Sequence, residues 1–115
     1  MPERERTYAG PELASRTPSG WSASEGSISR HYRTTGWSAT LMLVNAIGFL
    51  AEAADHHPDL MVSWDSVRVT LSTHSAGGVT DKDLALAALI DRTALWTPDK
   101  DSPLAGAKKP LVRGG

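Results

Sequence analysis

Histidine is the residue type whose placement in this sequence most strongly suggests chemistry. Three of the four histidines, His56, His57 and His74, fall in one stretch of the chain. An imidazole has an ordinary pKa of about 6.5, so it can donate or accept a proton near neutral pH. This grouping is suited to acid–base chemistry.

Acidic and aromatic residues accompany these histidines. Glu52 lies four positions before His56, so the two share a face if the segment is helical. Glu52 could then fix the orientation of the His56 ring and favour its protonated form. Trp64 and Asp83 follow further along the chain.

The hydrophobic pattern predicts the elements that must position these side chains. Helical spacing predicts a helix near residues 38–56, ended by Pro58, and another near 81–94, with Thr80 as its N-cap. Two short runs, 21–24 and 27–33, separated by Glu25 and Gly26, predict a β-hairpin. Alternating residues predict two further strands over 60–64 and 67–71, with a tight turn at Asp65 and Ser66. The fold class is therefore α+β in two layers, a four-stranded antiparallel sheet covered on one face by two helices.

Strand alternation creates a difficulty for His74. If Val67, Val69 and Leu71 face the helices, Ser72 and His74 begin on the opposite side of the sheet. We therefore expect the strand to end, twist or bulge near Thr73, so that His74 can approach His56.

The two ends of the chain differ in composition from its middle. Residues 1–18 and 98–115 are polar and rich in Pro, Gly and Ser, which predicts a flexible arm and a flexible tail around a domain at 19–97. With 115 residues and no internal repeat, one domain is expected.

The bulk composition excludes several kinds of site and function. The absence of cysteine excludes disulfides and Cys-ligated zinc. A formal net charge of −1 favours neither nucleic acid nor a membrane surface. The apolar stretch at 39–54 is expected to be too short and too polar to span a bilayer, and the first residues lack a secretory signal, so a cytoplasmic protein is expected.

The spacing of these residues resembles that of a known family. The family motif consists of an acidic residue, three spacers, His-His-Pro, an aromatic six residues after the Pro, a His ten further on and a downstream Asp. All of these positions are matched here, by Glu52, His56, His57, Pro58, Trp64, His74 and Asp83. This pattern is similar to that of the pterin-4a-carbinolamine dehydratases, and the similarity covers about residues 21–91. The helix that many members carry before the first strand is shortened or missing, and Leu60 replaces an aromatic residue of animal members.

The resemblance implies a lyase that removes water from 4a-hydroxytetrahydropterin to give a quinonoid dihydropterin, without a cofactor or metal. It implies His56, His57 and His74 as catalytic residues, with His56 and His74 as acid and base and His57 mainly holding the pterin. Further substrate contacts are expected from Glu52, Asp55, Trp64, Ser72, Thr73 and Asp83.

The resemblance also implies partners for the chain. An aromatic amino acid hydroxylase would generate the substrate in pterin cofactor recycling, and no nucleic acid or membrane is involved. The open sheet edge and the broad apolar surface of the first helix predict a homo-oligomer, either a dimer or a tetramer.

Simpler interpretations exist for single residues. Asp83 could support the start of its helix, Glu52 could be a solvated residue, and Trp64 could belong to the core. His31 matches nothing in the pattern and is expected on the surface of a strand.

Two other functions compete with the dehydratase. A zinc site made of the three histidines is disfavoured because adjacent side chains on a helix diverge by about 100°. A non-enzymatic module that binds pterin or protein on the same fold is the second alternative.

Overall fold

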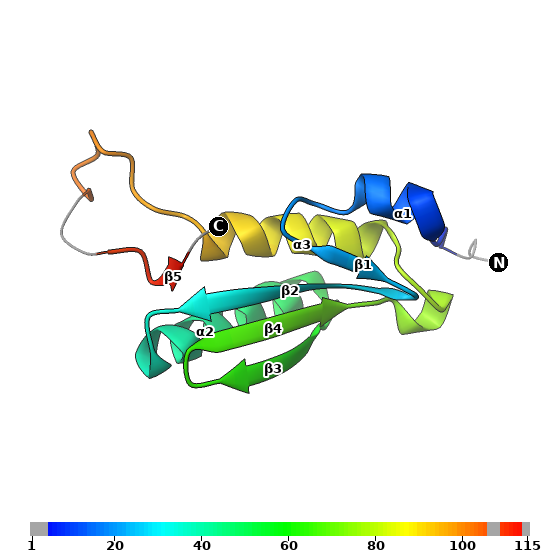
Figure 1. Cartoon of the computed structure of the whole chain (residues 1–115), viewed down its shortest axis with the longest axis horizontal. Coiled ribbons are helices and arrows are strands. Elements are labelled where there is room, and N and C mark those ends of the chain that lie inside the picture. Colours follow the sequence, from blue (N-terminus) through cyan, green and yellow to red (C-terminus); the bar gives the residue numbers. More distant parts are fainter. Residues whose placement is uncertain (1–4, 106–108, 114–115) are drawn as a thin grey trace.

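Two β-hairpins form the sheet at the centre of the molecule (Figure 1). In the computed structural model, which describes residues 5–105 and 109–113, the strands are β1 (Ser22–Ser24), β2 (Ser27–Thr34), β3 (Asp59–Ser63) and β4 (Ser66–Leu71). They pair antiparallel in the order β1-β2-β4-β3, which leaves β3 at one edge. The second hairpin turns at residues 64–65, one residue earlier than predicted.

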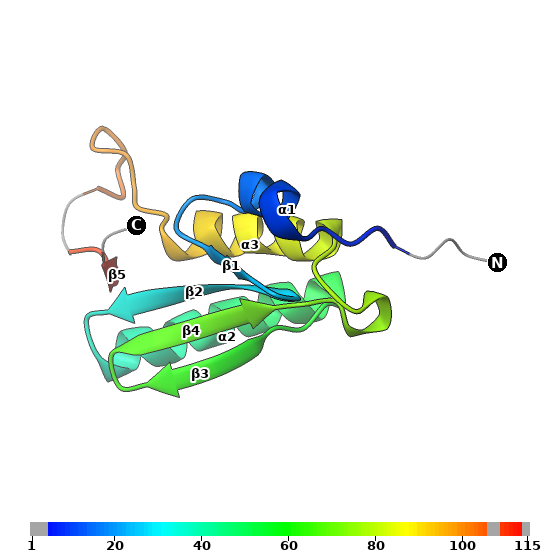
Figure 2. The same cartoon turned by 45° about the vertical axis from the view of Figure 1, so that its right-hand side comes forward.

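Helices α2 (Trp37–Ala54) and α3 (Asp81–Ala94) pack on one face of this sheet and contact each other (Figure 2). The predicted α+β fold, with two helices on one face of an antiparallel sheet, is confirmed. Both helices lie within one or two residues of the predicted ranges, because the apolar periodicity and the Thr80 cap were strong local signals.

Alternation places the core where it was expected. Val67, Val69 and Leu71 of β4 are fully buried, as are Ile28 of β2 and Ile90 of α3. These side chains fill the space between the sheet and the helices. The aromatic Tyr32 and the inner residues of α2 complete the same cluster.

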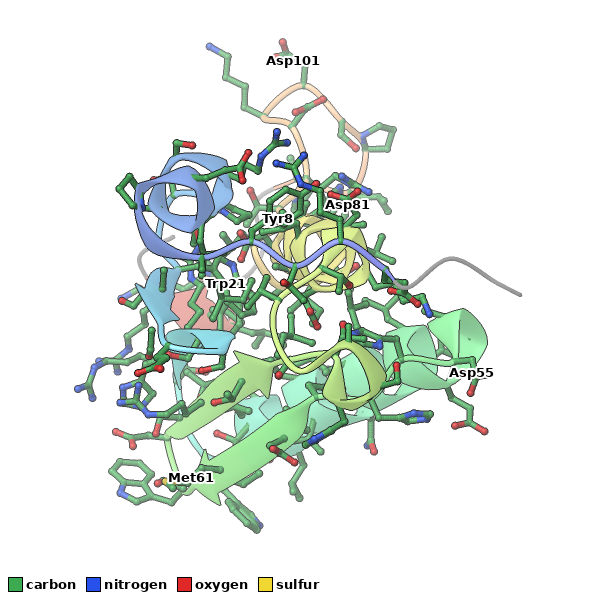
Figure 3. The ribbon with its side chains drawn as sticks, turned by 90° about the vertical axis from the view of Figure 1, so that its right-hand side faces the viewer. Tyr8, Trp21, Asp55, Met61, Asp81 and Asp101 are labelled. Atoms are coloured by element: carbon green, nitrogen blue, oxygen red, sulfur yellow. The ribbon has the colours of Figure 1, made fainter. Side chains whose placement is uncertain are left out.

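Part of the expected N-terminal arm belongs to this core. Helix α1 (Gly10–Arg16) begins after Tyr8, and both Tyr8 and Leu13 are buried. The Tyr8 hydroxyl donates to Asp81 at 2.9 Å, and the Tyr8 amide donates to the Val79 carbonyl at 2.9 Å (Figure 3). The expectation of a flexible arm over residues 1–18 is therefore corrected for residues 5–18, because two apolar anchors and a backbone pairing hold them; residues 1–4 lie outside the described residues.

The expected tail also includes ordered contacts. A two-residue strand β5 (Val112–Arg113) pairs with Arg33 and Thr34 at the end of β2. The Thr35 amide donates to the Leu111 carbonyl at 3.1 Å. The expectation of a flexible tail over 98–115 is corrected for this segment, because the end of β2 offers it unpaired backbone groups; residues 106–108 and 114–115 are not described.

Helix α2 has an unusually apolar exterior. It is 18 residues long with a mean hydropathy of 1.3, so by length and composition it could cross a membrane, contrary to the sequence expectation. Core helices of soluble proteins can have the same length and hydropathy. Helix α2 packs on the sheet through Ala39, Leu43, Ile47 and Ala51.

Candidate active site

The first histidine is positioned by the way α2 ends. The residue after the helix, Asp55, has a left-handed backbone with φ of 51°. The Asp55 amide donates to the Glu52 carbonyl at 3.2 Å, and the His56 amide donates to the Ala51 carbonyl at 3.1 Å. These two bonds form a Schellman motif, which ends the helix and turns the chain sharply. His56 therefore leaves the helical spiral and points towards the start of α3.

At the start of α3, His56 meets a buried carboxylate. His56 Nε2 lies 2.6 Å from Asp83 Oδ1, the Asp83 side chain has no exposed surface, and the His56 side chain is 13% exposed. The other Asp83 oxygen accepts from the Thr73 hydroxyl at 2.7 Å and the Thr80 amide at 2.9 Å. A carboxylate only accepts hydrogen bonds, so His56 Nε2 carries a proton and Nδ1 is the nitrogen left for chemistry.

Asp83 thus has two roles in one position. With Thr80 it completes the capping box that starts α3, as the sequence suggested. It also fixes the His56 ring, which the sequence did not predict. Both oxygens of Asp83 are occupied by hydrogen bonds from His56, Thr73 and Thr80. Asp83 therefore acts through His56, as a positioning residue.

Glu52 holds the second histidine. His57 Nε2 lies 2.8 Å from Glu52 Oε1, and both side chains are mostly exposed. The expected contact between Glu52 and His56 is wrong, because the left-handed turn at Asp55 breaks the four-residue helical spacing on which it was based.

The third histidine lies on a turn that begins because β4 ends early. The strand stops at Leu71, and a short 3₁₀ turn (His74–Ala76) follows. The Thr73 amide pairs with the Gly78 carbonyl at 2.8 Å, and Gly77, at φ of 77°, closes the turn. The strand therefore ends before Thr73, as the alternation required. His74 is exposed on this turn, next to the residue that bonds Asp83.

Comparison with known proteins places this arrangement in a family. A profile described as pterin 4 alpha carbinolamine dehydratase matches residues 5–93. The chain belongs to this family. Two relatives named as pterin-4-alpha-carbinolamine dehydratases are 43% identical over 91 residues, in Chloroflexus aurantiacus, and 49% identical over 72 residues, in Aquifex aeolicus. The matches cover 79% and 63% of this chain and 96% and 73% of those proteins.

Two solved structures resemble this fold. A transcriptional coactivator/pterin dehydratase from Brucella melitensis superposes with a TM-score of 0.70 at 27% identity, over 75% of this chain and 96% of that one. A pterin dehydratase-like protein described as a RuBisCO assembly factor in the alpha-carboxysome superposes with a TM-score of 0.52 at 19% identity, over 62% and 82% of the two chains. The second likeness concerns the fold alone.

Of the other predicted site residues of this pterin-4a-carbinolamine dehydratase family member, three are next to the histidines in the sequence and one, Trp64, lies apart. Asp55 is exposed beside the histidines, and Ser72 and Thr73 lie on the segment before His74. The hydroxyls of these two residues already donate within the protein, Ser72 to the Gly26 carbonyl at 2.7 Å and Thr73 to Asp83.

Trp64 lies away from the histidines. It follows β3, whereas His56 and His57 precede this strand, and five residues of strand extend roughly 17 Å. The side chain is 68% exposed, so the interpretation of Trp64 as a core residue is wrong. Within one chain, the structure does not bring Trp64 to the histidine site.

An ion pair that the sequence did not indicate borders the site. Lys82 Nζ lies 2.8 Å from Glu5 Oε1. The Glu5 hydrogen bond, helped by its charge and those of Asp55 and Asp83, raises the pKa of Lys82. The hydrogen bond from Lys82 lowers the pKa of Glu5. Only the packing of the N-terminal segment across α3 brings these residues together, so no local sequence signal could have found them.

The geometry offers no ligand set for the zinc alternative. Among residues 5–105 and 109–113, no three His, Cys, Asp or Glu side chains are grouped so that they could hold one ion. A hollow of about 730 Å³ lies elsewhere, between α2 and the C-terminal segment, and is lined by apolar residues such as Met42 and Trp96. The histidines do not line it.

The left-handed conformation of Asp55 gives a prediction. Such a backbone costs a non-glycine residue about 1 kcal/mol, so Asp55→Gly should raise the free energy of unfolding by roughly that amount. Asp55→Val should lower it, because a β-branched side chain fits this conformation poorly. Urea denaturation checks both variants, and equal stability of the two would show that the turn at Asp55 is not as described.

Proposed function

We propose that this chain dehydrates 4a-hydroxytetrahydropterin to a quinonoid dihydropterin by histidine acid–base catalysis. The C4a–O bond breaks, the hydroxyl takes a proton and leaves as water, and N5 loses its proton as the N5–C4a double bond forms. One proton is supplied and one removed, so no oxidant or reductant is needed. Membership of the family supports this reaction class.

The observation that carries the proposal is the 2.6 Å contact between His56 and the fully buried Asp83. Through this contact, Asp83 holds the ring in one orientation. His56 therefore presents Nδ1 as a proton-transfer group of fixed geometry. Fixed geometry is what proton transfer in a transition state requires.

His74 supplies the second proton-transfer group in this proposal. Its exposed position on the 3₁₀ turn leaves it accessible to a ligand bound beside His56. A 4a-hydroxytetrahydropterin between the two would place its leaving hydroxyl and its N5 proton within reach of two different imidazoles. The test is spectrophotometric: product should form from freshly generated substrate faster with the protein than without it.

His57 is proposed to position the substrate. Its bond to Glu52 orients the ring, and 57% of the His57 side chain is exposed. His57→Ala should therefore raise KM several-fold with little change in kcat, which is the mark of a lost binding contact. Glu52→Gln, which keeps a hydrogen-bond acceptor, should have a smaller effect on KM. Steady-state kinetics decide, and a large fall in kcat for His57→Ala with unchanged KM would instead make His57 a proton-transfer residue.

We further propose that the protein is a homo-oligomer. Four large apolar residues of α2, Trp37, Leu41, Met42 and Phe49, are 41–74% exposed, and strand β3 has an open edge. Burial of this surface between subunits would contribute hydrophobic free energy that the folding of a single chain does not provide. Sedimentation at micromolar concentration should give a dimer or tetramer. A single species of 12.3 kDa would contradict this proposal.

The setting of the reaction is also part of the proposal. Hydroxylation of an aromatic amino acid is the reaction that produces this carbinolamine, so a hydroxylase in the cytoplasm would supply the substrate. The alternative role is a non-enzymatic binding module, and the structural neighbour described as an assembly factor has a similar fold. The dehydration assay separates the two roles.

A further inference from the structure

The sheet has a second face, turned away from α2 and α3, and its centre is cationic. The strand register sets His31 of β2 directly opposite Arg68 of β4, and Arg33 opposite Arg113 of β5. Directly opposed residues point to the same side of a sheet, as do residues two apart on one strand. The four side chains therefore share one face, and all four residues are exposed. Met61, the partner of Arg68 on β3, projects from the same face (Figure 3).

This grouping is unfavourable for folding. Like charges directly opposite each other, as in the pair Arg33 and Arg113, destabilise a sheet. None of the ion pairs within the described part of the chain involves Arg33, Arg68 or Arg113. Burial, followed by the charges of Arg68 and Arg33, lowers the pKa of His31, against a smaller opposing effect of Asp65. Stability of the single chain therefore gives no reason for placing these charges together.

The residues around the charges are small and hydroxylated. The same alternation places on this face a set of serines and one threonine: Ser22, Ser24, Ser27, Ser29, Ser63, Ser66 and Thr70. Asp59, opposite Thr70, is the acidic strand residue on this face. The strand positions of this face carry no Phe, Tyr or Trp in the described residues, and His31 supplies the one aromatic ring. Apart from Met61, the face is thus polar, and it is positive at its centre.

We propose that this cationic face, centred on Arg33, Arg68, Arg113 and His31, binds an acidic extended segment of a partner protein. Alternate side chains of an extended peptide repeat at about 6.6 Å, which matches the spacing of residues 31 and 33 along β2. Guanidinium groups bind carboxylates through paired, charge-assisted hydrogen bonds. The chain as a whole has a net charge of −1, so attraction of an acidic partner depends on this local face.

The absence of Phe, Tyr and Trp from these strand positions, which leaves His31 as the one ring for stacking, disfavours single-stranded nucleic acid. Sheet surfaces that bind single strands stack bases on aromatic side chains. Three arginines would also neutralise only a few phosphates, which gives weak binding at physiological salt. An acidic peptide needs neither stacking nor a long basic track. The peptide therefore fits the chemistry of the face better.

The proposal is tested with a fluorescein-labelled peptide of twelve glutamates and the full chain. Fluorescence anisotropy at low salt should show saturable binding, and a matched peptide of twelve glutamines should not bind. The double variant Arg33→Ser/Arg68→Ser should weaken glutamate-peptide binding roughly tenfold or more. Arg92→Ser removes an exposed arginine from α3 and serves as the control, which should bind like the wild type.

Other readouts separate this surface from the dehydratase site. The double variant should keep the unfolding midpoint of the wild type or exceed it, because like-charge repulsion is relieved, and it should keep the dehydration rate. No saturable binding of the glutamate peptide would overturn the proposal. So would equal losses in the double variant and in Arg92→Ser. A twelve-nucleotide uridine RNA that binds more tightly than the peptide, and loses binding in the same double variant, would assign the face to nucleic acid instead.

Discussion

Replacing Asp83 with asparagine should lower kcat for pterin dehydration about 10²–10⁴-fold while the chain still folds. The asparagine carbonyl can accept from Thr73 and Thr80, as one carboxylate oxygen does now. Its amide group then faces His56 Nε2 and donates to it, which moves the ring proton to Nδ1. His56 would then lose the nitrogen lone pair that is proposed to act on the substrate.

The control for this experiment is Asp81→Asn. It removes an acidic residue from the same first turn of α3, but Asp81 contacts Tyr8 and not His56. Its kcat should stay close to the wild-type value. If Asp83→Asn retains full kcat, Asp83 does not position His56 and only caps the helix.

The alanine variant separates the structural role of Asp83 from its catalytic role. Asp83→Ala removes the acceptor of three buried or half-buried donors, on His56, Thr73 and Thr80. Each unsatisfied donor costs about 1–3 kcal/mol, so the free energy of unfolding should fall by roughly 3–9 kcal/mol. For a domain of this size, such a loss can prevent folding. The asparagine variant is therefore the informative one for catalysis.

Removing both proposed proton-transfer groups should nearly abolish turnover. Proton transfer by a placed side chain typically contributes 10²–10⁴-fold, so His56→Ala and His74→Ala should each lower kcat. Carbinolamines dehydrate unaided, and either histidine can partly replace the other, so the single losses are expected at the low end of this range. In the His56→Ala/His74→Ala double variant, the rate should approach that of the uncatalysed reaction.

His31→Ala is the matched control for the double variant. It removes a histidine from the far face of the sheet, and its kcat should equal that of the wild type. Circular dichroism should show that all these variants fold, although variants that lack His56 should unfold at a lower midpoint, because one oxygen of the buried Asp83 loses its partner. A double variant as fast as the wild type would refute the acid–base assignment.

Local signals in the sequence were sufficient for most of the fold. Apolar periodicity defined both long helices, and alternation defined β3 and β4, because each pattern repeats over several turns or strand residues. The buried Tyr8 and the strand β5 could not be predicted in this way. Each depends on a single pairing between distant segments, Tyr8 with Val79 and Val112 with Thr34.

The sequence indicated which residues form the candidate site, but not all of the contacts between them. The spacing identified the histidines and Asp83, yet it paired Glu52 with the wrong histidine. The reason is one residue, Asp55, whose left-handed backbone no periodicity reveals. The predicted strand over 60–64 already placed Trp64 at the end far from His57, and β3 confirms this position, yet the family motif grouped Trp64 with the histidines.

The most direct test of the central claim is multiple turnover by the wild-type protein. Freshly generated 4a-hydroxytetrahydropterin, in large molar excess over the protein and with a chelator present, should dehydrate well above the uncatalysed rate. The acceleration should be proportional to protein concentration, and each chain should complete many turnovers. A rate equal to the uncatalysed one, with or without stoichiometric binding of the pterin, would contradict the proposed enzyme and favour a binding module on the same fold.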